Sequence, residues 1–263
     1  MHPKQQERKM SMKTISIINL KGGVGKTISA INIAYILTDV YSKKVLLVDN
    51  DKQGNTSMFF NLLSGDIKTI SDIMEEPNFN TEEAIYKTTF PQLDVIPANM
   101  FLAIAIQNLA NEEEQTQQTR LVRALERVQG NYDYCIIDNP PDVNLSVINA
   151  FAATNDVLVP VKADMFSFDG LETIVELTES AKALNRNIRF KGCFLTMYQK
   201  NNINKLSLER LRNYTGYPVF STVIRSSVKA AETTYYKKPL LIYSKNCNAS
   251  KDYIALVEEY LSK

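Results

Sequence analysis

A glycine-rich segment near the amino terminus has the residue types and spacing of a phosphate-binding loop. An apolar run at 15–18 leads into Lys21-Gly22-Gly23-Val24-Gly25-Lys26-Thr27, and an apolar helical pattern follows. Glycine lets backbone N–H groups crowd around an anion, the lysine adds positive charge at the terminal phosphates, and the threonine hydroxyl can bind Mg²⁺. A helix beginning at Lys26 would point the positive end of its dipole at the same phosphates. The segment therefore predicts a site for a nucleotide with Mg²⁺.

The loop departs from the general pattern G-x-x-x-x-G-K-[ST] at its first position. Leu20 stands where that pattern requires glycine, and a second lysine, Lys21, follows it. A dinucleotide-binding G-x-G-x-x-G motif starting at Gly23 would need glycine at position 28, which is Ile28. The dinucleotide alternative therefore fails. We expect the nucleotide to be bound by eight consecutive residues, namely Lys21, Gly22, Gly23, Val24, Gly25, Lys26, Thr27 and Ile28.

Three aspartates come at the ends of two other apolar runs. Asp49 and Asp51 follow the run at 45–48, and Asp138 follows the run at 134–137. Aspartate is a poor strand former, so each of these residues could simply begin a turn. Near a phosphate-binding loop, a carboxylate linked to Mg²⁺ is the stronger interpretation. The residues expected to serve the metal are Thr27, Asp49 and Asp138.

The string K-G-G-V-G-K-T resembles the deviant Walker A loop of the ParA/MinD family of ATPases. Residues 45–55 resemble the family element D-x-D-P-Q-G-N, and residues 134–141 resemble its Walker B strand with the turn that follows. The resemblance covers roughly residues 13–262 and favours the small class of ParA partition ATPases, which lacks an amino-terminal helix-turn-helix domain. The chain departs from the common family pattern at Ile28, Lys52 and Asp142.

The resemblance implies a Mg²⁺-dependent ATPase that works as an ATP-dependent homodimer. It implies catalytic roles for Lys26 at the phosphates, for Asp51 in orienting the attacking water, and for Lys21 in reaching the nucleotide of the partner subunit. It further implies a ParB-like centromere-binding partner, non-specific double-stranded DNA as a ligand, and the segregation of a plasmid or chromosome as the task.

The basic residues are distributed unevenly. The net charge is +1, yet the segment from Arg186 to Lys245 holds twelve Lys and Arg against two Glu, which leaves the rest of the chain acidic. An asymmetric distribution of this kind is typical of a surface that binds a polyanion, although basic residues can also merely solvate helices. With the family resemblance, we expect a DNA-binding face that includes Lys205, Arg212, Arg225 and Lys229.

Alternating apolar runs and helical patterns predict an α/β fold: a mostly parallel twisted sheet with helices on both faces, in a single P-loop domain over 13–263. Residues 1–12 are expected to form a flexible arm, and 56–92 a surface excursion of small helices. Strands are expected at 14–19, 44–49, 93–97, 133–138, 156–161, 189–196 and 219–224. Helices are expected at 26–39, 117–129, 167–185, 203–214, 226–236 and 249–262.

Composition favours a cytoplasmic protein, and the family resemblance implies association with the nucleoid when ATP is bound. No apolar stretch approaches 18 residues and no signal peptide is visible, so we expect no membrane partner. The scattered cysteines Cys135, Cys193 and Cys247 include no CxxC pair, which argues against disulfides and zinc. With His2 as the only histidine, catalysis by a Ser-His or Cys-His pair is excluded.

Two alternatives stay open on the sequence. A MinD-like regulator at the membrane surface would need a basic amphipathic carboxyl-terminal helix, and Glu258 and Glu259 lie near the end of the last helical pattern. A reductase-type electron donor related to the nitrogenase iron protein would need cysteine ligands, against which the scattered cysteines argue. Binding to anionic vesicles and an iron assay would separate these possibilities.

Overall fold

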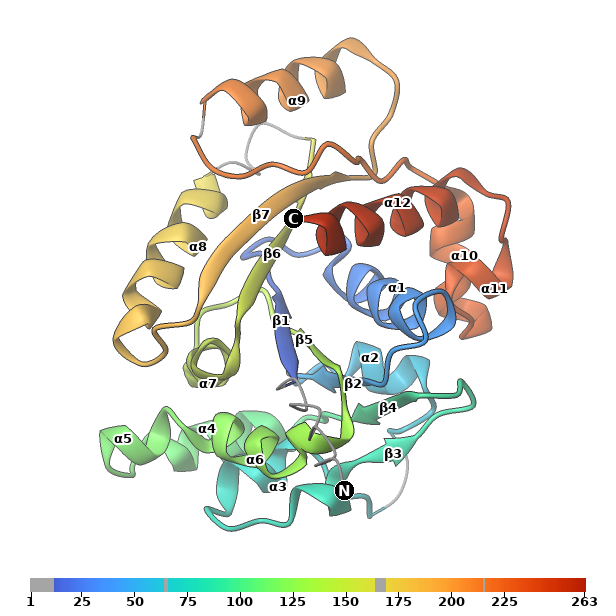
Figure 1. Ribbon diagram of the computed structural model, residues 1–263. Helices are drawn as coiled ribbons and strands as arrows, with labels where there is room; N and C mark the ends of the chain where they lie inside the picture. The colour runs from blue at the N-terminus through green and yellow to red at the C-terminus, as the bar shows by residue number, and fades with distance from the viewer. Residues whose placement is uncertain (1–11, 64–65, 164–168, 215) are drawn as a thin grey trace, which may run out of the picture.

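The computed structural model describes residues 12–63, 66–163, 169–214 and 216–263 (Figure 1). The flexible arm expected over 1–12 lies outside these residues, apart from Met12, which is buried in the core. Within the part of the chain that is described, no helix is both long and apolar enough to cross a membrane.

Among the described residues, seven strands form one sheet in the order β3-β4-β2-β5-β1-β6-β7, and only the β3–β4 pair is antiparallel. This confirms the predicted mostly parallel α/β sheet. β1, β2 and β5 lie in the middle of this order and are almost completely buried, as their unbroken apolar runs predict. The strands are β1 (Lys13–Ile17), β2 (Val45–Asp49), β3 (Tyr86–Lys87), β4 (Leu93–Ile96), β5 (Tyr134–Asp138), β6 (Asp156–Lys162) and β7 (Arg189–Thr196).

Helices cover both faces of the sheet (Figure 1). One face packs against α1, α2, α11 and α12, and the other against α3, α4, α6, α7 and α8, with separate apolar clusters between the layers. The α-helices are α1 (Lys26–Asp39), α2 (Asn55–Phe59), α3 (Ile70–Glu75), α4 (Phe101–Leu109), α5 (Glu114–Gln117), α6 (Arg120–Val128), α7 (Leu145–Ala153), α8 (Asp169–Ser180), α9 (Asn202–Tyr214), α10 (Val228–Tyr236), α11 (Leu240–Tyr243) and α12 (Asn248–Ser262). Short 3-10 turns are η1 (Thr81–Ala84), η2 (Gln129–Asn131) and η3 (Ala181–Ala183).

The prediction of a strand at 219–224 is wrong. The segment runs alongside β7 and is bonded to it at intervals, for example from Phe220 N to Cys193 O at 2.8 Å and from Ile224 N to Leu195 O at 2.7 Å. Only isolated bridges form, of Val219 with Cys193 and of Arg225 with Tyr198, because the bonded residues Phe220 and Ile224 are four apart while their partners Cys193 and Leu195 are two apart. Its Val and Ile content instead reflects burial of Phe220 and Ile224 under α12.

The predicted helices are all present. The one expected at 26–39 coincides with α1, whereas the others are shifted at one or both ends; residues 167–168 of the helix expected at 167–185 lie outside the described residues. Several other helices were not expected. The 117–129 helix begins only at Arg120, and α4 and α7 were missed although both are largely apolar. α7 is buried on several sides, so its apolar positions do not follow a one-sided pattern. α4 does bury one side, through Leu102, Ala105 and Leu109, but its exposed apolar residues Phe101 and Ile104 obscure that pattern in the sequence.

The excursion at 56–92 does contain small helices, together with the short edge strand β3. It is not confined to the surface, however, because Phe59, Ile70, Ile73 and Met74 are buried in the core.

A buried carboxylate at the start of β6 ties the carboxyl-terminal helix to the sheet. The Asp156 carboxylate accepts bonds from Arg189 Nε at 2.6 Å, Tyr260 Oη at 2.6 Å and Lys13 Nζ at 2.9 Å. Burial by itself would raise the pKa of Asp156, but the bonds from Arg189, Tyr260 and Lys13 outweigh it and hold this pKa below its ordinary value. The carboxylate therefore stabilises the fold in its ionised form.

We expect Asp156→Asn to lower the free energy of unfolding by about 1.5–3 kcal/mol at neutral pH, the usual contribution of hydrogen bonds to a charged group. Because the pKa is lowered in the folded state, the contribution is complete above the ordinary aspartate pKa of about 3.9 and is lost as pH falls through the lowered value. Urea unfolding of both proteins at pH 7 and at acidic pH measures this. Equal midpoints at pH 7 would contradict it.

Candidate nucleotide-binding site

The glycine-rich loop lies between the end of β1 and the start of α1. Gly23 and Gly25 have φ angles of 72° and 88°, and Gly25 is the residue that caps α1 at Lys26. Side chains other than glycine rarely adopt such positive φ angles. At Gly23 a Cβ would meet no atom within 4 Å, so backbone conformation and not packing requires glycine there. The loop is therefore open to a ligand on that side.

Two polar residues that the sequence did not single out hold the loop in place. Asn19 is fully buried; its Oδ1 accepts a bond from Lys21 N at 2.9 Å, and its Nδ2 donates to Pro160 O at 2.7 Å. Thr196, at the end of β7, donates from its hydroxyl to Val24 O at 2.8 Å. The loop is thus tied to the ends of β6 and β7 at both its head and its middle.

Lys26 is buried at the base of the loop, with 8% of its surface exposed. Its ammonium donates to Lys21 O at 2.9 Å. Burial lowers the pKa of Lys26, while attraction to Asp138, Asp51 and Asp142 acts in the opposite direction. A partly desolvated cation held among carboxylates is well suited to bind a phosphate anion, because each charge is weakly screened there.

A cleft of about 490 Å³ opens above the loop. It is lined by all the residues predicted to bind the nucleotide except Lys21 and Val24, and by Asp51 of the β2–α2 turn. Residues that the sequence did not predict complete its wall. The cleft is lined by Gly22, Gly23, Gly25, Lys26, Thr27, Ile28, Ile31, Asp51, Gln53, Asn55, Met58, Phe59, Pro141, Met197 and Thr234.

Asp49 and Asp138 lie side by side beneath the cleft, in register at the ends of β2 and β5. Burial raises the pKa of both carboxyls; for Asp49, repulsion from Asp138 adds to this effect. Asp49 Oδ2 accepts bonds from the Ser57 hydroxyl at 2.6 Å and from Ser57 N at 2.8 Å, and its Oδ1 accepts from Asp51 N at 3.2 Å. Asp49 is therefore fixed by the turn that carries Asp51.

Asp138 has a different environment. Its Oδ2 accepts a bond from the Thr56 hydroxyl at 2.8 Å, while its Oδ1 is buried without a hydrogen-bond partner among the described residues. The hydroxyl of Thr27 lies close enough to lower the pKa of the Asp138 carboxyl, as does the charge of Lys26. An uncompensated buried carboxylate oxygen near a threonine hydroxyl fits a hard cation such as Mg²⁺.

The number of protein groups near Asp138 that could bind a metal is also the number that Mg²⁺ usually needs. The part of the chain that the structure describes contains no group of three or more His, Cys, Asp or Glu arranged to hold a metal ion. Mg²⁺ keeps several waters and is typically bound through one or two protein groups plus substrate phosphates, so Thr27 and Asp138 suffice.

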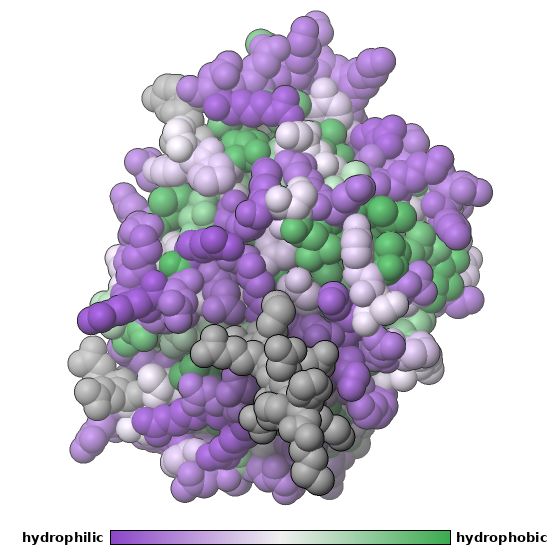
Figure 2. Space-filling view, in the orientation of Figure 1, coloured by the Kyte–Doolittle hydropathy of each residue, from purple (hydrophilic) through white to green (hydrophobic). Residues whose placement is uncertain are grey.

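The four basic residues expected to contact DNA are all exposed but are divided between two regions. Lys205 and Arg212 lie on α9, which stands at the top of the molecule and is mostly hydrophilic (Figures 1 and 2). Arg225 and Lys229 lie near α10, each with an acidic partner: Arg225 Nη2 is 2.6 Å from Asp252 Oδ1, and Lys229 Nζ is 2.8 Å from Glu232 Oε2. The sequence did not indicate these two ion pairs.

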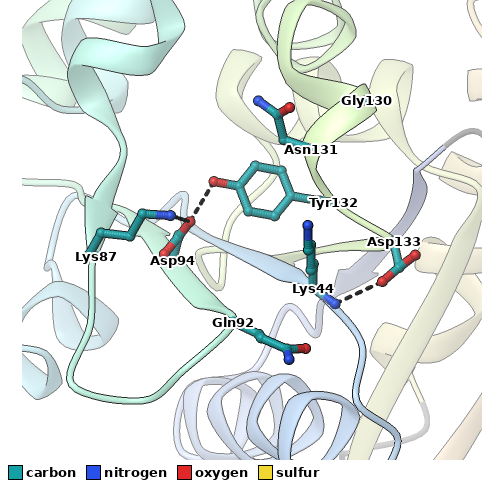
Figure 3. Close-up of a pocket in the computed structure, with 8 residues that line it drawn as sticks. All are labelled: Lys44, Lys87, Gln92, Asp94, Gly130, Asn131, Tyr132 and Asp133. Carbon is teal, nitrogen blue, oxygen red and sulfur yellow. Dashed lines mark hydrogen bonds and ion pairs between the residues drawn. The ribbon is translucent and has the colours of Figure 1, made fainter.

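A larger cavity of about 640 Å³ lies at the opposite edge of the sheet, where β2, β4 and β5 begin (Figure 3). Lys87 Nζ and Tyr132 Oη both bond to Asp94 Oδ2, at 2.6 and 2.7 Å, and Lys44 N donates to Asp133 Oδ2 at 2.8 Å. Because these charged groups largely satisfy one another, the cleft above the loop is the better candidate for chemistry.

Comparison with known proteins agrees with this site. Residues 12–190 match the sequence family described as an AAA domain. The chain is 35% identical over 250 residues to the sporulation initiation inhibitor protein Soj of Bacillus subtilis, covering 94% of this chain and 97% of Soj. It is 32% identical over 257 residues to the chromosome partitioning protein ParA of Caulobacter vibrioides, covering 96% and 95%. The chain therefore belongs to the ParA/Soj/MinD family of P-loop ATPases, among the Soj- and ParA-like partition ATPases.

Solved structures show the same fold. McdA of Cyanothece in complex with ATP superimposes with a TM-score of 0.85 at 22% identity, over 96% of this chain and 97% of McdA. Cobyrinic acid a,c-diamide synthase of Mycobacterium smegmatis with ADP and magnesium gives 0.81 at 22% identity, over 94% and 93%. The cell division ATPase MinD of Pyrococcus furiosus gives 0.78 at 22% identity, over 95% and 98%. At these identities the likeness shows the fold alone.

Proposed function

We propose that this ATPase forms a dimer when it binds ATP and Mg²⁺, and that the dimer binds double-stranded DNA without sequence preference. A ParB-like centromere-binding protein would stimulate hydrolysis, and the pair would segregate a plasmid or a chromosome. The observation that carries the proposal is the second lysine, Lys21, at the head of a phosphate-binding loop, in a chain similar to Soj and ParA over nearly its whole length.

The residues around the cleft suit hydrolysis of the γ-phosphate. Lys26 and the loop N–H groups would neutralise charge on the phosphate oxygens, and Asp51 would orient the attacking water. Mg²⁺ held by Thr27 and Asp138 would supply further charge neutralisation at the phosphates. Asp49 would act on the water ligands of the metal and, through Asp51 N, keep the Asp51 turn in place.

Lys21 would act across the dimer. Its ammonium would reach the nucleotide of the partner subunit, so the γ-phosphate gains a second cation only when two subunits meet. ATP would then stabilise the dimer, and loss of the γ-phosphate would release it, which makes the assembly a nucleotide-timed switch. In the cell, the ATP-bound dimer would be found on the nucleoid.

DNA would be bound through phosphates by Lys205, Arg212, Arg225 and Lys229. Because Arg225 and Lys229 already have acidic partners, the α9 residues Lys205 and Arg212 should contribute more to affinity. A dimer doubles the basic surface, so affinity should rise when ATP is bound.

We expect Lys205→Ala to weaken binding to any duplex and to make the salt dependence of the dimer shallower by about 1.8 in the log–log slope, because each of the two subunits loses one phosphate contact worth about 0.9. Arg225→Ala should have a smaller effect, and both variants should dimerise with ATP like the wild type. Filter binding at several salt concentrations, with ATP and with ADP, measures this. Arg123→Ala is the control, because Arg123 is an exposed arginine on α6, away from both regions. Equal affinity in both nucleotide states would remove the basis for the DNA site.

A further inference from the structure

Two buried asparagines join the strand ends that carry the aspartates of the site. Asn50 follows Asp49 at the end of β2, and Asn139 follows Asp138 at the end of β5; their exposed fractions are 0% and 1%. Asn50 Nδ2 donates to Asn139 Oδ1 at 2.9 Å. The side-chain amides thus extend the pairing of the two strands beyond the sheet.

Both amides also bond to the neighbouring elements. Asn139 Nδ2 donates to Ile17 O and to Ile137 O, each at 3.3 Å. Asn50 Nδ2 donates to Ser146 O, in the first turn of α7, at 3.1 Å. The pair therefore connects the carboxyl ends of β1, β2 and β5, from which the phosphate-binding loop, the Asp51 turn and Asp138 emerge.

The arrangement leaves one polar atom unsatisfied. Asn50 Oδ1 is buried and has no hydrogen-bond partner among the described residues. Rotating the amide by 180° would not help, since its oxygen would then face two acceptors, Asn139 Oδ1 and Ser146 O. A buried unsatisfied acceptor costs about 1–3 kcal/mol, and an apolar pair of similar volume would avoid that cost. Unsatisfied buried groups are few in native proteins, and a role in catalysis is one of the reasons for which they are retained.

We propose that Asn50 and Asn139 form a positioning pair for ATP hydrolysis, whose amide bridge sets the placement of the Asp51 turn relative to Asp138. Neither asparagine lines the cleft, so the pair acts through its neighbours. The inference rests on the proposed roles of Asp51 and Asp138 in hydrolysis, and it is independent of DNA and of any partner protein. Displacement of a reacting group by about 1 Å costs on the order of 100-fold in rate.

The test is a double-mutant cycle with Asn50→Leu, Asn139→Leu and the double variant. We expect each single variant to lower kcat by roughly 10- to 100-fold, with the Kd for Mg-ADP within about twofold of wild type. The Tm should fall in each single variant, because the remaining asparagine loses its partner, and it should recover in the double variant, in which both amides are replaced. The double variant should be no slower than the slower single variant, because the bridge is already broken in each. Asn50→Ala and Asn139→Ala, made in parallel, serve if the leucine variants do not fold.

Asn149→Leu is the matched control. Asn149 is equally buried and donates to Gln117 O at 2.6 Å and to Leu145 O at 3.0 Å, away from the cleft. This variant should lower the Tm while kcat stays near wild type. Wild-type kcat in Asn50→Leu would overturn the proposal, as would parallel losses of kcat, nucleotide affinity and Tm in both the leucine and alanine variants. Failure of the wild-type protein to hydrolyse ATP would instead refute the proposed function, and the bridge with it.

Discussion

Lys26→Ala is expected to abolish detectable ATP binding. The variant loses a partly desolvated ammonium, worth about 3 kcal/mol or more in charge-assisted bonds to phosphate, so affinity should fall roughly 100-fold or further. The loss is increased by Asp138 and Asp51, because the positive charge of Lys26 that attracts these carboxylates would no longer offset their repulsion of the phosphates. Calorimetric titration with Mg-ATP measures the effect.

Lys52→Ala is the control for this experiment, because Lys52 is an exposed lysine in the turn beside the cleft. It should bind ATP with nearly wild-type affinity. Tight binding retained by Lys26→Ala would show that the phosphates are bound elsewhere than at the loop.

Lys21→Ala and Asp51→Ala should separate dimerisation from turnover. Without Lys21, the monomer should still bind ATP, because Lys26 and the loop N–H groups remain, but ATP should no longer drive dimer formation. Without Asp51, the attacking water loses its orienting group, so hydrolysis should fall by about 10²- to 10⁴-fold and a long-lived ATP dimer should accumulate.

Sedimentation of both variants with ATP, alongside a phosphate-release assay, tests this pair of predictions. Asp51→Ala is the control for the dimer assay, since it is expected to form the ATP dimer that Lys21→Ala loses, and retained ATP binding shows that Lys21→Ala is folded. If Lys21→Ala forms the same dimer as the wild type, the proposed action of Lys21 across the interface is wrong.

Much of the fold could be predicted because its signals are local. The central strands β1, β2 and β5 are continuous apolar runs, and the loop after β1 carries its chemistry in consecutive residues. In parallel strands that lie side by side, carboxyl ends meet at one edge of the sheet, so Asp49 and Asp138 could be expected to lie near the loop. The structure confirms that they are neighbours.

The segment at 219–224 shows where local signals fail. Its apolar residues are buried, as in a strand, but burial by itself does not decide whether the backbone continues a ladder. Pairing with β7 depends on the path that the chain takes between α9 and α10, which is a tertiary property. The predicted DNA-binding face also depends on tertiary structure. A count of charges in the sequence treats Arg225 as unpaired, whereas the fold places the Asp252 carboxylate against its guanidinium.

By itself, the sequence determined the phosphate-binding loop, the aspartates at the strand ends and the α/β class, because glycine geometry, charge and apolar periodicity act over a few residues. Only the tertiary structure decided how these groups are held: Asn19 against Pro160, Thr196 against Val24, and Asn50 against Asn139. Each of these hydrogen bonds joins residues far apart in the chain. A single amide or hydroxyl has many possible partners in a sequence, and only the folded backbone brings one of them within hydrogen-bond distance.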